Sequence, residues 1–444
     1  MSNTYLTKTY AQNAGNRKKF TVSAWFKRSK LGATQDLISA YRASDGFQTD
    51  VIRFGATDDL EFYAHSTLGN SPASFQTVRL FRDTSAWYHV VVMVDTTESA
   101  GTDRFKLYVN GERIMYTTGF TTENYPVQND EMVWGIGSGV VHTIGAVGTA
   151  NYFDGSASHI HYCDGYAYNA NNFGETDTTT GEWKAKTSPS VTYGTNGFFI
   201  LKDSNLVTDQ SGRGNNFAVG GGTLTKTEDC PDNVFSTCSK EPMRRLSGTY
   251  VKPVLSNGNT TWDATGADVG ATVTLSNLGA TTGKYYMEAK VGGSYADSSR
   301  IGVGTHENYN GTTFFNSTSS NYVSYTANGE KNIAGTTSSY GASYTVGDII
   351  SVALDCDNNT VTFYKNGASQ GAINIANNDN FKHFSCGGYD ATGSNITNWI
   401  CNFGNGYFGT TAVSSAGTNA SGNGIFEFDV PTNYTALSTK GLNL

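Results

Sequence analysis

Carboxylates are the first side chains in this sequence that could do chemistry. A glycoside-cleaving site on a β-sheet needs two carboxylates that face one cleft, for example at alternating positions of one strand. The nearest clusters are Asp58-Asp59 with Glu61, and Asp130-Glu131, and both lie in polar stretches that we interpret as turns or strand ends with solvated charges. A serine nucleophile motif before a helix is also missing from the sequence. We therefore expect no catalytic residue and no enzyme activity, with a glycan-degrading enzyme as the less favoured alternative.

Candidate metal ligands are scattered along the chain. Carboxylates in loops are hard oxygen ligands that suit Ca2+, and three aspartates lie in stretches that we interpret as loops: Asp45, Asp50 and Asp154. Aspartate is also common in turns for conformational reasons alone, so we expect no cofactor, with Ca2+ as the open alternative. His159 and His161 share one face of a predicted strand, and His142 could complete a site, but packing within the sheet is the favoured interpretation.

A loop rich in aromatic and amide side chains is the candidate binding site. The stretch Asn308 to Tyr325 reads NYNGTTFFNSTSSNYVSY and lies between two predicted strands. Aromatic faces with short amides and hydroxyls are suited to a glycan or a protein surface. The candidate ligand-binding residues are Tyr309, Asn310, Phe314 and Phe315. The alternative is that Phe314 and Phe315 cap a core.

The six cysteines show no Cys-x-x-Cys pair, so neither a zinc site nor a dense disulfide framework is indicated. We expect reduced, mostly buried thiols. Cys230 and Cys238 lie in an irregular stretch and are the one pair that the sequence leaves open.

Composition limits the classes of partner. Only 15% of the residues are charged, and the net charge is -8. A chain without a stripe of basic residues has no surface suited to the phosphates of a nucleic acid, so we expect no nucleic-acid partner. The sequence contains neither a secretory leader at its start nor an apolar run of about 18 residues, which disfavours membrane insertion and favours synthesis in a cytoplasm.

Alternating apolar residues predict strands in both halves of the chain. FTVSAWFKR (20–28) should point Phe20, Val22, Ala24 and Phe26 into a core, and WYHVVVMVD (87–95) is typical of a buried central strand. In the stretch RFKLYVNGERIMY, Asn110-Gly111 predicts a type I′ hairpin turn. Together with FDGSASHIHYCDGYAY (153–168), these phrases resemble the laminin-G-like, concanavalin-type jelly roll.

The second half carries a different set of phrases. They are GKYYMEAKV (283–291), IGVGT (301–305), YTVGDIISVALDCDNNTVTFYKNGASQG (344–371) and ICNFGNGYF (400–408). Their order resembles a SPRY domain, which implies a second antiparallel sandwich. Between the two halves, FGETDTTTGEW, YGTNGFFILKD and DQSGRGNNF contain aromatic residues at a spacing that favours an ordered connector over a floppy linker.

These connector phrases, and the final FEFDVPTNYTALSTKGLNL, resemble tail and appendage proteins of bacteriophages. We therefore expect an all-β protein with two antiparallel β-sandwiches: a jelly roll (1–170), a connector (171–253), a SPRY-like sandwich (254–410) and a C-terminal extension (411–444). The resemblance implies a structural virion protein, such as a tail fibre, knob, appendage or capsid decoration, that attaches to a host glycan or surface protein.

The same resemblance implies the partners of the chain. They would be other capsid or tail proteins, and copies of the chain itself, because virion components are repeated by symmetry. A purely structural component that contacts only other virion proteins remains the alternative to host attachment.

Overall fold

The computed structural model divides the chain into two compact units, Met1–Lys226 (unit 1) and Thr227–Leu444 (unit 2). The chain is described except for residues 1–2, 12–13, 43–48, 66–72, 136–138, 179–180, 187, 203–205, 239–253, 264–269, 293–298, 306–321, 376–379, 391–397 and 444. Each unit is an antiparallel β-sandwich, which confirms the predicted fold class. No helix in the described part of the chain is long and apolar enough to cross a membrane.

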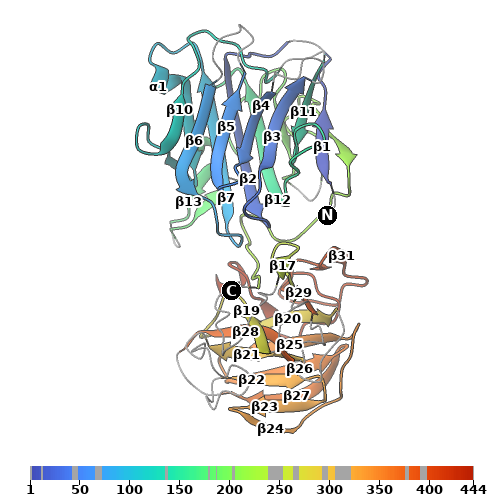
Figure 1. Ribbon diagram of the computed structural model, residues 1–444. Helices are drawn as coiled ribbons and strands as arrows, with labels where there is room; N and C mark the ends of the chain where they lie inside the picture. Colours follow the sequence, from blue (N-terminus) through green and yellow to red (C-terminus); the bar gives the residue numbers. More distant parts are fainter. Residues whose placement is uncertain are drawn as a thin grey trace. The chain divides into compact units, whose positions relative to one another are not determined.

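Unit 1 contains two sheets that enclose one core (Figure 1). The larger sheet has eight strands in the order β10 (Phe120–Asn124), β6 (Ala73–Leu80), β5 (Asp59–Ala64), β4 (Thr49–Phe54), β3 (Gln35–Arg42), β11 (Val140–Ile144), β1 (Tyr5–Lys8) and β16 (Ala218–Gly221). The smaller sheet has six strands in the order β15 (Phe198–Ile200), β12 (Gly155–Asp164), β2 (Lys19–Arg28), β7 (Trp87–Asp95), β8 (Phe105–Val109) and β9 (Glu112–Arg113). A short helix, α1 (Gly101–Arg104), precedes β8.

The core of unit 1 forms from the residues that the alternating pattern selected. Phe20, Val22, Ala24 and Phe26 of β2 all lie in it with at most 2% of their surface exposed. The turn between β8 and β9 has positive φ at both Asn110 (50°) and Gly111 (84°), as a type I′ hairpin requires. The predicted inward face of β2 and the predicted hairpin are therefore confirmed.

A further layer covers the outer face of the six-stranded sheet. It contains η1 (Ala170–Asn172) and the hairpin of β13 (Gly174–Thr176) and β14 (Trp183–Ala185). Phe173 and Ala170 of this layer pack on Val91 and Cys163 of the sheet. Because both faces of β7 are covered, all nine of its residues are buried, which explains its continuous apolar run.

The stretch 171–253 was expected to be a separate connector, but the structure divides it between the two units at residues 226 and 227. Its strands β15 and β16 pair with β12 and β1, and Phe198, Ile200 and Phe217 lie in the core of unit 1. Residues after 226 belong to unit 2, where Phe235 and Cys238 are buried. The described part of this stretch thus completes the two sandwiches and does not form a body of its own.

Unit 2 is the second sandwich (Figure 1). One sheet has the order β17 (Val254–Ser256), β18 (Thr261–Asp263), β29 (Asn398–Asn402), β20 (Lys284–Val291), β25 (Ile349–Asp355), β26 (Thr360–Lys365) and β27 (Ala368–Asn374), with β32 (Thr435–Ala436) parallel to β20. The other has the order β19 (Gly270–Leu275), β28 (Lys382–Asp390), β21 (Arg300–Thr305), β22 (Val323–Thr326), β23 (Glu330–Ile333) and β24 (Thr336–Ser339). The remaining elements are the hairpin of β30 (Tyr407–Phe408) and β31 (Thr411–Ala412), and η4 (Gly441–Asn443).

The C-terminal residues are part of the fold of unit 2. Phe426, Val430 and Ala436 form a second apolar cluster with Tyr286 of β20 and Ala353 of β25. Glu288 of β20 is fully buried beneath them, and its carboxylate accepts hydrogen bonds from the backbone N–H groups of Glu427 (2.8 Å) and Phe428 (2.9 Å). The segment expected as an extension at 411–444 therefore covers one face of a sheet.

Candidate functional site

The predicted binding loop falls outside the described residues. Tyr309, Asn310, Phe314 and Phe315 belong to the stretch 306–321, and Asp45 belongs to 43–48. The expectation that this loop binds a ligand stays a prediction.

Asp50 lies in β4 and not in a loop, so its predicted placement was wrong. Its side chain is fully buried, and its carboxylate accepts backbone hydrogen bonds from His65 (2.9 Å), Val133 (2.6 Å) and Trp134 (2.9 Å). Burial raises the pKa of Asp50 to about 7. Both oxygens are thus engaged in holding backbone segments together, a role that explains the residue without a metal.

Asp154 does lie in a loop, immediately before β12, and its backbone carbonyl accepts a hydrogen bond from Ser29. In the described residues, no group of three histidine, cysteine, aspartate or glutamate side chains is placed to hold a metal ion. The histidines have other contacts: His161 stacks on Phe199 and His142 packs edge-on against Tyr10.

The acidic cluster at 58–61 was interpreted wrongly as solvated loop charges. Asp58 is 6% exposed and contacts the buried guanidinium of Arg28 at 3.1 Å, while Asp59 is 1% exposed. Asp59 begins strand β5 and Glu61 follows on the same face. This face is the outer face of the eight-stranded sheet, because Leu60 and Phe62 point into the core.

Two rows of polar side chains cross the outer face of this sheet. The register pairs Arg53 with Glu61 and Glu61 with Gln76, and in the next row it pairs Tyr63 with Ser74 and Ser74 with Asn124. We call this set the polar face: Arg53, Glu61, Tyr63, Ser74, Gln76 and Asn124. It spans the four neighbouring strands β4, β5, β6 and β10, which lie side by side in Figure 1.

Contacts within the polar face hold several of its side chains in place. The Nε of Arg53 lies 2.6 Å from an oxygen of Glu61, and the amide of Asn124 donates to the hydroxyl of Ser74 at 2.8 Å. The ring of Tyr63 packs edge-on against His65, with 5.0 Å between ring centroids. The Arg53 and Glu61 side chains remain 35% and 21% exposed, so this ion pair is still open to a ligand.

Asp36 of β3 borders the polar face, since the register places it opposite Arg53. Burial raises the pKa of Asp36 to about 6, although a hydrogen bond with Asn151 and the positive charge of Arg53 each lower this pKa. Beyond Asp36, Ser39 and Thr143 both donate to the carbonyl of Ala146, so the loop after β11 is held against this side of the sheet. The polar face therefore has a fixed border.

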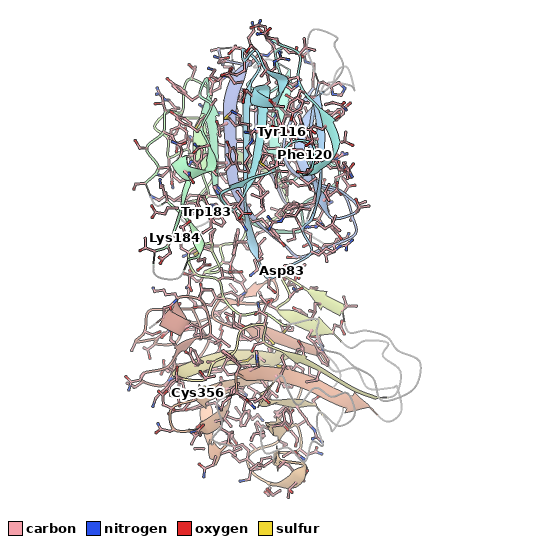
Figure 2. The ribbon with its side chains drawn as sticks, turned by 90° about the vertical axis from the view of Figure 1, so that its left-hand side faces the viewer. Asp83, Tyr116, Phe120, Trp183, Lys184 and Cys356 are labelled. Carbon is pink, nitrogen blue, oxygen red and sulfur yellow. The ribbon has the colours of Figure 1, made fainter. Side chains whose placement is uncertain are left out.

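On the outer face of the six-stranded sheet of unit 1, buried polar side chains form a hydrogen-bonded chain. Trp183 of the β13–β14 hairpin donates its indole N–H to Nδ1 of His89 at 3.0 Å, so the other ring nitrogen carries the proton and donates to Ser23 at 2.8 Å. Figure 2 shows Trp183 beside Lys184 on this hairpin. Burial lowers the pKa of His89 to about 3, so the ring stays neutral and structural.

The polar face can form several kinds of contact with one ligand. It combines an aromatic ring with a guanidinium, a carboxylate, amides and a hydroxyl, which together donate and accept hydrogen bonds in fixed planes. Both carboxyl groups on this side of β5 already have partners: Glu61 binds Arg53, and Asp59 accepts from the hydroxyl of Thr57 at 2.6 Å. The arrangement suits recognition of a hydroxyl-rich surface.

Sequence reasoning missed this face although the signal was present. DLEFYA alternates polar and apolar residues, which predicts a strand with Asp59, Glu61 and Tyr63 on one side. The adjacent Asp58-Asp59 pair favoured a turn instead. Which residues of β4, β6 and β10 lie beside β5 depends on register and could not be predicted from this strand alone.

Comparison with known families identifies both domains. Residues 2–164 match the concanavalin A-like lectin/glucanases superfamily, and residues 284–386 match the SPRY domain family. The chain therefore carries a concanavalin A-like domain in unit 1 and a SPRY domain in unit 2, as the motifs predicted.

Solved structures similar to this chain include the SPRY domain of human HERC1 and another human SPRY domain. They are 20% and 13% identical, with TM-scores of 0.29 and 0.27, and the matches cover 34% and 35% of this chain and 91% and 96% of theirs. Stonustoxin is 12% identical with a TM-score of 0.28, and that match covers 37% of this chain and 28% of the toxin. A comparison with curated proteins finds no match.

Proposed function

We propose that this protein, with its concanavalin A-like and SPRY domains, is a non-catalytic bacteriophage virion component that binds host surface glycans through the polar face of unit 1. The observation that carries the binding proposal is the pair of polar rows around Tyr63 on a rigid sheet. A sheet presents such groups in a fixed arrangement, so little conformational entropy is lost on binding.

The virion assignment has separate support. It rests on the resemblance of the connector phrases and the C-terminal phrase to phage tail and appendage proteins. In such a particle the chain would contact other capsid or tail proteins and further copies of itself. Repeated copies on a symmetric particle would turn weak single contacts into strong attachment.

Engagement of the carboxylates supports a binding role over a glycanase role. Hydrolysis of a glycosidic bond needs one carboxyl group that can give a proton and a second that is free to act as base or nucleophile. Glu61 is paired with Arg53, and Asp59 accepts a hydrogen bond from Thr57. Glu61, with 21% of its side chain exposed, can orient hydroxyl groups of a ligand, whereas Asp59 is only 1% exposed and lies beneath the surface.

The test is binding of the purified full chain to an array of bacterial surface glycans and to bacterial cells. Tyr63→Ala should weaken glycan binding at least tenfold, about 1.4 kcal/mol, because it removes the aromatic surface while leaving the core intact. Tyr166→Ala is the matched control, since Tyr166 is 39% exposed and stacks on Tyr168 away from the polar face.

A second variant, Tyr309→Ala with Phe315→Ala, examines the loop proposed from the sequence. Loss of binding in this variant but not in Tyr63→Ala would move the site to the loop. Failure of the unaltered chain to bind any glycan or cell would contradict adhesion and favour a component that contacts only other virion proteins.

A further inference from the structure

Three cysteine thiols lie in a row inside unit 2. The sulfur of Cys401 on β29 lies 3.8 Å from that of Cys238 on one side and 3.8 Å from that of Cys386 of β28 on the other. All three are at most 3% exposed, and all are free thiols. Cys238 lies 163 positions before Cys401 and Cys386 lies 15 positions before it, so the fold brings the distant Cys238 to the other two.

The two possible cysteine pairs differ in the elements that a disulfide bond would join. A disulfide needs the sulfurs about 2.05 Å apart and the Cα atoms within about 7 Å. Cys386 and Cys401 belong to the two facing sheets, and sheets pack about 10 Å apart, so their bond would pull two sheets together. Cys238 lies outside the named strands, where an isolated bridge to Ser276 and a backbone hydrogen bond to Asn259 hold it, so its bond to Cys401 would not join two strands of the facing sheets.

We propose that Cys238 and Cys401 are a redox pair that forms an internal disulfide when the protein meets a peroxide. The two thiols lose two protons and two electrons to form the S–S bond, and hydrogen peroxide takes them up to become two molecules of water.

Burial sets the rate of this reaction. The pKa of Cys238 is held well above its usual value by its hydrogen bond to Cys401 and by burial, and burial also raises the pKa of Cys386. Few thiolates are present at neutral pH, so oxidation proceeds over hours through local opening of the fold. The bond would join the segment before β17 to β29 and close a loop of 163 positions.

The experiment treats the folded full chain with hydrogen peroxide in a Cys230→Ala background. Cys230 is the one cysteine of the six that is not fully buried, so its removal prevents links between molecules. After unfolding with an alkylating reagent present, peptide mass spectrometry under non-reducing conditions should show Cys238 joined to Cys401. Cys163, Cys356 and Cys386 should be alkylated.

Thermal unfolding gives an independent measurement. The oxidised chain should unfold several degrees higher than the reduced chain, and dithiothreitol should reverse the shift, because a long closed loop restricts the unfolded chain. Cys238→Ala should abolish the shift, whereas Cys386→Ala should keep it. Full alkylation of all five thiols after peroxide, or Cys386–Cys401 as the first bond formed, would overturn the proposal.

Discussion

Buried carboxyl groups act as backbone anchors in both units. Asp50 in unit 1 and Glu288 in unit 2 each lie in a strand, each is fully buried, and each accepts backbone hydrogen bonds from a segment distant in sequence. Such groups are costly to bury, but the backbone N–H groups that they bind would be unsatisfied without them. Each of these two carboxyl groups therefore joins its strand to a distant segment of backbone.

The pH dependence of stability should reveal Glu288. Burial raises the pKa of Glu288 to about 7 from its ordinary value of 4.5, so the folded protein holds this proton more tightly than the unfolded chain does. The resulting stability is fully present below pH 4.5 and is lost as the pH rises through 7. The Glu288→Gln variant cannot titrate, so the stability advantage of the unaltered protein over it should be about 2 kcal/mol larger at pH 5 than at pH 8.

Chemical denaturation of both proteins at the two pH values measures this difference. Any hydrogen bond that the glutamine fails to make lowers stability equally at both pH values, so it cancels. An advantage that is constant between pH 5 and pH 8, or that grows with pH, would contradict the assignment of Glu288 as the titrating group.

At the scale of elements, segments outside the two matched domains complete the sheets. Strands β15 and β16 extend the sheets of unit 1, and residues near the C-terminus cover the outer face of β20 and β25 in unit 2. A sheet face without such cover would expose its apolar residues and leave Glu288 without its backbone donors. These segments are therefore required by the fold.

Deletion of residues 425–444 tests this role. It removes Phe426, Val430 and Ala436 from their cluster with Tyr286, so we expect unit 2 to lose cooperative unfolding while unit 1 keeps its own transition. Calorimetry and binding of a hydrophobic dye would report both effects. Removal of residues 442–444 alone is the control, since Leu442 is 38% exposed, and it should change little. A cooperative, dye-free unit 2 in the long deletion would show that the cover is dispensable.

At the scale of the whole molecule, the sequence predicted the two sandwiches because their central strands carry strong local patterns. The boundaries of β7 match WYHVVVMVD, and Asn366-Gly367 has positive φ at both residues, as Asn110-Gly111 does. The three-residue strand β15 and the strand AVGG of β16 carry no visible period, so their place in the sheets depends on pairing with distant strands.

The candidate site was less accessible to sequence reasoning. Tyr63, Gln76 and Asn124 come from three strands whose register brings them to one face, and no local pattern encodes that pairing. Glu288 in the middle of KYYMEAKV predicts a solvent-facing position, yet a segment 139 positions away covers it. Long-range contacts thus decide both features.

A crystal structure of the full chain with the best-binding oligosaccharide from the glycan array would show directly whether the polar face holds a sugar. We expect a sugar ring against Tyr63, with its hydroxyl groups within hydrogen-bond distance of the Arg53–Glu61 pair or of Gln76. A sugar bound elsewhere on the chain, with the polar face empty, would contradict the assignment of this face as the binding site.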